Sequence, residues 1–367
     1  MIDPPREAVK SSIEIAKNAG IKIKIITGDN PITAMAIAEK IGLENSKVIT
    51  GDEIDLLSDS ELKKIIYETD IFARTKPQHK YRIVDLLKRE GEIVAVTGDG
   101  INDAPALKHA DVGIAMGIKG TDATKEVADI VLKDDNFVTI VNTIKEGRRI
   151  YQNILSFVKY MLSTNFDDIL IVGIITVAGF PLPLLPLQIL WVNIATDALP
   201  ALALGRSPAD KNIMQDKPHP KNENILLKFS SSIIIVLIIQ IIVNFAIYIY
   251  GLGIDKALSI DSYDLDINSH ARTMVFTQIV LFEIFFAFIC KETKKFKLSS
   301  IGSNKYLLMA VAISFILQLM VIYTPFMQDI FKTTALSPME WLIIGLGACT
   351  TLLVPYLETL AKKLFVK

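Results

Sequence analysis

Hydrophobic and polar positions follow different patterns in the two parts of the chain. From residue 1 to about 150, short apolar runs alternate with amphipathic segments, whereas residues 154–360 hold long apolar runs separated by short polar loops. About 20 consecutive apolar residues are enough for a helix to cross a bilayer. The pattern predicts an α/β domain over residues 1–150, followed by an all-α bundle of six transmembrane helices over residues 151–367.

The first part alternates helix and strand signals. Such alternation is typical of a parallel, Rossmann-like sheet with helices on both faces. The expected strands are residues 21–26, 71–73, 93–96, 112–115 and 130–132, and the expected helices are residues 8–19, 33–41, 59–68, 79–89 and 104–109.

The second part contains six apolar segments of membrane-spanning length. A helical pattern that begins at Phe137 runs without a breaker into the first of them, so one helix should join the two parts. Most Lys and Arg residues outside the first part lie in loops 205–228 and 291–305 and in the tail, which places the first part and the C-terminus in the cytoplasm. The expected spans are about 154–178, 185–204, 229–250, 271–290, 306–325 and 339–360.

Composition agrees with an integral, multi-pass membrane protein. Hydrophobic residues make up 51% of the chain, and a mean hydropathy of +0.39 is too high for a purely soluble protein. The net charge of −1 gives no reason to expect a nucleic-acid partner. The two cysteines, Cys290 and Cys349, lie in or beside apolar segments, which excludes a disulfide scaffold or a cysteine zinc site.

The run TGDGINDAPAL, residues 97–107, carries the clearest chemical signal. It follows an apolar run and places Asp99 and Asp103 in the turn that opens a helix, where parallel sheets bind phosphate and metal. Carboxylate oxygens suit Mg²⁺, and Gly98 and Gly100 let a phosphoryl group approach the backbone. An ordinary turn with a helix cap is the alternative, but eleven residues in this order favour a site.

Two other segments supply matching groups. Thr27, Gly28 and Asp29 follow the first strand with a hydroxyl and backbone N–H groups, and Lys80 lies at a helix start. Phosphoryl transfer needs such donors around the equatorial oxygens of the phosphoryl group. Taken singly, Lys80 is typical of a solvated helix residue and Thr27 of a turn residue. Their joint presence, in this order, favours a phosphoryl site.

Carboxylates in the middle of three apolar spans predict a cation site. A charged residue at a helix centre costs roughly 2.5–3.5 kcal/mol on insertion scales, so it rarely lies there without a partner. Oxygen ligands suit a hard cation such as Ca²⁺. Hydrogen bonds that lock the bundle are the alternative. The candidate ligands are Asn165 and Asp168 in the first span, Asn193, Thr196 and Asp197 in the second, and Glu283 in the fourth.

Two neighbours of these residues modify the expectation. Asp167 is turned about 100° away from the face of Asp168. Pro200 lies soon after Asp197 and frees a backbone carbonyl, so the second span should unwind near the site.

Longer motifs carry a family resemblance over nearly the whole chain. MIDPPR, ITGDN, FARTKPQHK and TGDGINDAPALKHADVGIAMG resemble the back half of the phosphorylation domain of P-type cation-transporting ATPases, within the haloacid dehalogenase superfamily. STNFDDI, LLPLQILWVNIATDALPALALG and RTMVFTQIVLFEI resemble the calcium-transporting branch. The resemblance implies a haloacid dehalogenase type fold, Mg²⁺ and ATP as cofactors, and Ca²⁺ as the transported ion.

The resemblance also implies roles for single residues. Asn193 favours the calcium type over the sodium/potassium type, and Asp168 stands where the family usually has a longer glutamate. In the phosphorylation domain Thr27, with Gly28 and Asp29 beside it, would hydrogen-bond the phosphoryl group, Lys80 would stabilise it, Asp99 would ligate Mg²⁺, and Asn102 and Asp103 would complete the shell. In the membrane the cation would be held by Asn165, Asp168, Asn193, Thr196, Asp197 and Glu283.

Several parts of such a pump are missing from the 367 residues. No DKTGT motif with its phosphorylated aspartate is present, nor are the actuator domain, the nucleotide-binding domain and the first four helices. We therefore expect a C-terminal part of a pump that needs its N-terminal half and does not hydrolyse ATP alone. The alternatives are a non-catalytic ion-binding or interaction subunit of a split pump, and a membrane-tethered phosphatase, which the missing nucleophile disfavours.

Overall fold

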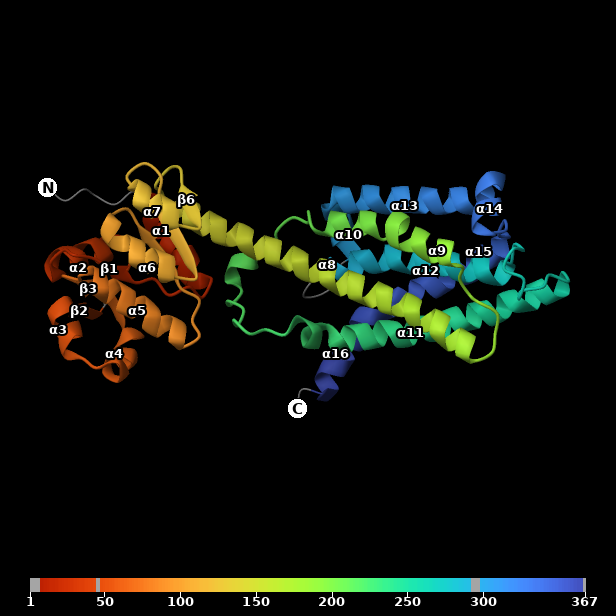
Figure 1. Ribbon diagram of the computed structural model, residues 1–367, viewed down its shortest axis with the longest axis horizontal. Coiled ribbons are helices and arrows are strands. Elements are labelled where there is room, and N and C mark those ends of the chain that lie inside the picture. Colours follow the sequence, from red (N-terminus) through yellow and green to blue (C-terminus); the bar gives the residue numbers. More distant parts are fainter. Residues whose placement is uncertain (1–6, 44–46, 292–297, 366–367) are drawn as a thin grey trace. The chain divides into compact units, whose positions relative to one another are not determined.

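The computed structural model describes residues 7–43, 47–291 and 298–365 (Figure 1). The MIDPPR segment at residues 1–6, one of the motifs that carry the family resemblance, lies outside this range. The chain divides into two compact units. The first comprises Met1–Arg148 and Ala209–Glu223, and the second comprises Arg149–Pro208 and Asn224–Lys367.

The first unit alternates helices with short parallel strands, as the sequence predicts. Its helices are α1 (Glu7–Asn18), α2 (Pro31–Lys40), α3 (Gly51–Leu56), α4 (Asp59–Ile66), α5 (Pro77–Arg89), α6 (Ala104–His109) and α7 (Asp122–Val127), with a 3₁₀ turn at Ile101–Asp103. Its strands are β1 (Ile25–Ile26), β2 (Lys47–Thr50), β3 (Thr69–Ala73), β4 (Ala95–Gly98), β5 (Val112–Met116) and β6 (Ile130–Leu132). Strand β2 and helices α3 and α7 were not anticipated.

The expectation of a single sheet is wrong, because the strands form two separate sheets. Their orders are β1–β3–β2 and β4–β5–β6, and every pairing is parallel. β1 and β4 each pair on one side only, so each is an edge strand. The expected strand 21–26 is shorter in the structure and comprises only Ile25–Ile26. Among the described residues, residues 21–24 have no partner in the sheet, and the Lys24 side chain donates to the carbonyls of Ile66 and Thr69.

Side-chain caps fix where the helices of this unit begin. Asn30 accepts a hydrogen bond from the amide of Thr33, and Pro31 occupies the first turn of α2, where its missing N–H costs nothing. Ser58 and Glu61 form a capping box at the start of α4. Each cap ends the preceding connection at a defined residue, so the turn between β1 and α2 and the connection between α3 and α4 are both short.

The second unit is helical. Helix α8 (Phe137–Val177) begins in the first unit at the predicted residue and continues unbroken into the second. The other helices are α9 (Pro186–Trp191), a π-helical segment (Val192–Thr196), α10 (Ala198–Leu204), α11 (Ile225–Ala257), α12 (His270–Cys290), α13 (Lys305–Tyr323), α14 (Pro325–Phe331), α15 (Pro338–Cys349) and α16 (Leu353–Phe365).

Six helical segments in the described part of the chain are long and apolar enough to cross a membrane, and they match the six expected spans. Helix α12 is the central one, because 89% of its apolar window is buried against 28–44% for the other five. Its neighbours α11, α13 and α15 pack around it. Glu283 on α12 is therefore positioned inside the bundle rather than toward lipid.

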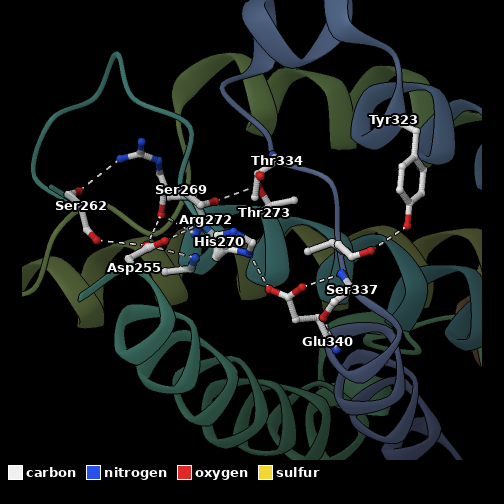
Figure 2. A network of polar contacts seen from close by, with 12 residues as sticks. Asp255, Ser262, Ser269, His270, Arg272, Thr273, Tyr323, Thr334, Ser337 and Glu340 are labelled. Atoms are coloured by element: carbon white, nitrogen blue, oxygen red, sulfur yellow. Dashed lines mark hydrogen bonds and ion pairs between the residues drawn. The ribbon is translucent and has the colours of Figure 1, made fainter. Parts of the chain in front are cut away.

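One end of this bundle is held by a network around Asp255, the last acidic residue of α11 (Figure 2). The Asp255 carboxylate is fully buried and accepts hydrogen bonds from the Ser269 hydroxyl at 2.6 Å and the Ser262 hydroxyl at 3.1 Å. It also accepts from the amides of His270 at 2.8 Å and Ala271 at 3.2 Å, which open α12. A single carboxylate thus joins α11 to the start of α12.

The same network reaches the loop before α15. The His270 Nδ1 atom lies 2.6 Å from a carboxylate oxygen of Glu340, which is itself buried and caps α15 together with Ser337 (Figure 2). The buried Arg272 guanidinium donates to backbone carbonyls of the connection between α11 and α12. The loops at this end are therefore fixed by buried polar contacts.

We expect Asp255→Ala to lower the free energy of unfolding by about 3 kcal/mol, because several buried donors lose their acceptor. Asp255→Asn should cost less, since its carbonyl oxygen can still accept. Thermal unfolding in detergent measures the effect, and Asp329→Ala, which removes an exposed carboxylate on α14, is the matched control. An unchanged unfolding temperature for Asp255→Ala would contradict the structural role.

Candidate functional site

The turn after β1 holds the Thr27 hydroxyl in one position. The Asp29 amide donates to the Thr27 hydroxyl at 3.1 Å, and this hydroxyl donates to the Asp29 carboxylate at 3.2 Å. The turn is joined to the end of β3, because the Arg74 amide donates to the Asp29 carbonyl and the Thr75 amide to the Thr27 carbonyl. Gly28 is exposed between them, so its backbone N–H is open to a ligand.

Lys80 and Asp103, predicted separately, meet in the structure. The Lys80 ammonium at the start of α5 lies 2.5 Å from the Asp103 carboxylate, which is 8% exposed. Gly98 permits this approach, since a Cβ atom there would lie 2.5 Å from the Cβ of Asp103. Asp99 and Asn102 are exposed at the same turn. Asp103 therefore has Lys80 as its counter-charge, while the carboxylate of Asp99 faces solvent.

These groups form two sets within the first unit. Thr27 with Asp29 is one set, and Lys80 with Asp103 is the other. Among the residues that the structure describes, no hydrogen bond or ion pair joins Thr27 to Asp99. Both residues nevertheless follow parallel strands at their carboxyl ends, where ligands of α/β sheets bind.

His79 fixes the helix that carries Lys80, and sequence reasoning missed it. Its buried ring bonds Asp55 through Nε2 at 2.8 Å and accepts from the Lys76 amide through Nδ1 at 3.2 Å. The bond from His79, and after it the bond from Lys76, lowers the pKa of Asp55 below its usual value. Gly51 leaves room for the ring, because a Cβ there would lie 2.9 Å from it. His79 thus positions the adjacent Lys80.

Three carboxyl groups of the second unit are buried and interact electrostatically. Asp168 on α8, Asp197 before α10 and Glu283 on α12 are 4%, 0% and 2% exposed. Asp168 interacts electrostatically with Asp197, and Glu283 with both. Both oxygens of Asp168 and of Glu283, and one oxygen of Asp197, have no hydrogen-bond partner. Within the described residues, no Lys, Arg or His side chain pairs with any of them.

The predicted amide and hydroxyl ligands lie near these carboxyl groups in sequence. Asn165 is on α8 with Asp168, and Asn193 and Thr196 are in the π-helical segment that precedes Asp197. Each donates its hydrogen to a carbonyl of its own helix, which leaves its oxygen lone pairs available. The bonds run from Asn165 to Met161, from Asn193 to Ile189 and from Thr196 to Val192, at 2.8, 3.0 and 2.9 Å. The described residues contain no group of three or more Asp, Glu, His or Cys side chains that could hold a metal ion in their present positions.

Two residues of α8 add to the set found from sequence. The fully buried Tyr160 donates its hydroxyl to Asp197 at 2.8 Å. Tyr160 and Asp168 are eight residues apart, about 80° around the helix, so the spacing alone does not single out Tyr160. Asp167, turned away from Asp168 on the helix, is also buried, and one of its oxygens has no partner.

The second span becomes π-helical next to these carboxylates, whereas the sequence predicts that it unwinds there. Val192–Thr196 is π-helical, and the Asp197 amide donates to the Val192 carbonyl five residues earlier at 2.9 Å. Such a bulge is frequent at functional sites, because it rotates side chains out of regular helical register. Here it carries Asn193, Thr196 and Asp197 within one turn.

Two protein-family models match the chain. Residues 1–111 match the haloacid dehalogenase-like hydrolases, and residues 181–363 match the C-terminal part of cation transporting ATPases. A calcium-transporting ATPase of Bacillus subtilis is 41% identical over 360 residues, covering 96% of this chain. Calcium-transporting ATPase 1 of Yarrowia lipolytica is 38% identical over 374 residues, covering 100% of this chain. Calcium-transporting ATPase type 2C member 1 of Pongo abelii is 40% identical over 350 residues, covering 94% of this chain.

The chain spans only part of these relatives. It covers 39% of the Bacillus subtilis and Yarrowia lipolytica proteins and 37% of the Pongo abelii protein.

Proposed function

This chain belongs to the P-type cation-transporting ATPases, and we propose that it works as the C-terminal part of a calcium pump. In this proposal the second unit supplies a Ca²⁺ site inside the membrane. The first unit supplies part of the centre that accepts and releases a phosphoryl group.

The buried carboxyl groups of Asp168, Asp197 and Glu283 carry the proposal. Burial of an ionised carboxylate is costly unless a cation or hydrogen-bond donors compensate it, and most of their oxygens accept no hydrogen bond from the described residues. The carbonyl and hydroxyl oxygens of Asn165, Asn193 and Thr196 extend an all-oxygen set, which suits Ca²⁺ better than a softer metal. We assign these side chains, on three helices, as the ligands of the transported ion.

The turns after β1 and β4 support the second half of the proposal. The fixed Thr27 hydroxyl and the backbone at Gly28 can hydrogen-bond a phosphoryl oxygen, and the Lys80 ammonium can stabilise its charge. The exposed Asp99 carboxylate forms no ion pair with the described residues, and it fits a hard cation such as Mg²⁺. When bound, Mg²⁺ supplies charge neutralisation for phosphoryl transfer. Asn102 and Asp103 lie on the same turn, where Asp103 fixes Lys80.

The open edges of β1 and β4 indicate where an N-terminal half would join. Lys22 before β1 and Glu92 before β4 lie 3.7 Å apart at their charged ends. One inserted strand would separate β1 from β4 by about 10 Å, a distance that these two long side chains can span. We propose that a strand of the N-terminal half, carrying the phosphorylated aspartate, fills this position and unites the two sheets. The first unit and the C-terminus are then cytoplasmic.

Equilibrium binding of radioactive Ca²⁺ to the full chain in lipid nanodiscs tests the ion site. We expect saturable binding that excess Mg²⁺ does not displace, because Mg²⁺ demands a smaller octahedral shell and dehydrates reluctantly. Binding that is absent, or that Mg²⁺ abolishes at equal concentration, would contradict a calcium site.

A further inference from the structure

The carbonyl oxygen of Thr196 has lost its helical partner. In a regular helix it would accept the amide hydrogen of residue 200, but that residue is Pro200, which has no N–H. A π-helical bond does not replace it, because the Ala201 amide, five residues on, donates to the Asp197 carbonyl at 3.0 Å. An unsatisfied carbonyl inside an apolar bundle is costly, so this oxygen needs a donor from elsewhere.

Ser314 on α13 provides that donor. Its hydroxyl donates to the Thr196 carbonyl at 3.0 Å, and the side chain is fully buried. Helix α13 packs along both α10 and the π-helical segment, so the contact is part of a continuous interface. Ser314 is 118 residues away in sequence and is not among the carboxylate, amide and hydroxyl groups assigned as ion ligands.

We propose that Ser314 is a positioning residue for the cation site. By holding the Thr196 carbonyl, it fixes the turn that carries the side chains of Asn193, Thr196 and Asp197. Ser314 does not touch the ion. The inference rests on the proposed calcium site for its functional part, whereas its structural part concerns only the π-helical turn.

Three variants of the full chain in nanodiscs separate this role from general packing. Ser314→Ala removes the donor, and we expect the dissociation constant for Ca²⁺ to rise about tenfold, since 1.4 kcal/mol corresponds to a factor of ten. Ser314→Thr keeps the hydroxyl and should bind as the wild type does. Gln318→Met is the matched control, because Gln318 is a buried polar residue one turn along α13 that bonds Thr277 of α12 instead.

A second readout does not depend on ion binding. Hydrogen exchange of the backbone amides of residues 192–204, followed by mass spectrometry without Ca²⁺, should speed up about tenfold in Ser314→Ala and not in Gln318→Met. If Ser314→Ala does not fold, Ser314→Cys, with its weaker donor, replaces it in both measurements.

The outcomes are distinct. Wild-type Ca²⁺ affinity and exchange in Ser314→Ala, or equal losses in Gln318→Met, would overturn the proposal. Absence of Ca²⁺ binding in the wild type would overturn the proposed function instead, while faster exchange confined to residues 192–204 in Ser314→Ala would still support the role of Ser314 in holding the turn.

Discussion

Replacing Asp197 by asparagine is expected to lower the Ca²⁺ affinity of the chain at least about a hundredfold. The substitution keeps the size of the side chain but removes a negative charge that is fully buried between α8, α10 and α12. We expect the substitution to reduce the binding free energy by about 3 kcal/mol, the upper range for a hydrogen bond or contact with a charged group. This loss corresponds to about two orders of magnitude in affinity. Asp197 has the largest expected effect because it is the most deeply buried of the three carboxyl groups.

Binding of radioactive Ca²⁺ by the wild type and the variant in parallel measures this effect. Glu340→Gln is the matched control, since Glu340 is also a buried acid of the second unit but pairs with His270 in the network around Asp255. We expect the control to bind Ca²⁺ like the wild type while unfolding at a lower temperature. Equal Ca²⁺ retention by the wild type and Asp197→Asn would refute the three-carboxylate site.

The second large effect concerns phosphorylation. Incubated with labelled ATP or acetyl phosphate, the chain alone should form no acid-stable phosphoprotein, because no DKTGT nucleophile is present in its sequence. When the chain is mixed with an N-terminal half that carries this motif, the label should appear on that N-terminal half. Asp99→Asn in this chain should then reduce the rate of labelling about a thousandfold, the scale of losing one preorganised electrostatic contact in such a site.

Acid gel electrophoresis of the mixture resolves which polypeptide carries the label. Asp122→Asn, at an exposed position on α7 of the first unit, is the control and should label at the wild-type rate. Label on this chain when it is incubated alone would contradict the proposed division of the catalytic centre. Undiminished labelling with Asp99→Asn would remove Asp99 from that centre.

The sequence predicted local features of the fold well. Asp59 and Ala104 begin helices where expected, and α8 begins at Phe137, because caps, prolines and apolar periodicity act within a few residues. The six apolar spans were equally readable, since length and composition alone define them. Pro200, through its missing N–H, indicated an irregularity in the second span, although the span is π-helical there rather than unwound.

Features that depend on distant neighbours were not predictable in the same way. The single expected sheet is two sheets, because strand signals do not reveal whether β1 and β4 find each other as partners. The ion pair of Lys80 with Asp103 and the bond of Ser314 to the Thr196 carbonyl join residues far apart in sequence. The roles given to Thr27, Asp99 and the membrane ligands remain predictions that the experiments above decide.

The exposed edges of β1 and β4 also bear on the solubility of this polypeptide during its synthesis. An edge strand presents unpaired N–H and C=O groups that can template pairing with another copy, which is a route to aggregation. The exposed Lys22 lies in the segment that leads into β1, and a charged side chain there opposes edge-to-edge pairing. In the four residues before β4, Glu92 is the one charged residue, and Ala95 and Thr97 of the strand are exposed. Of the two edges, β4 is therefore the one more prone to pair with another copy of the chain. Production of the first unit without a complementary strand should therefore yield self-associated material that forms through β4.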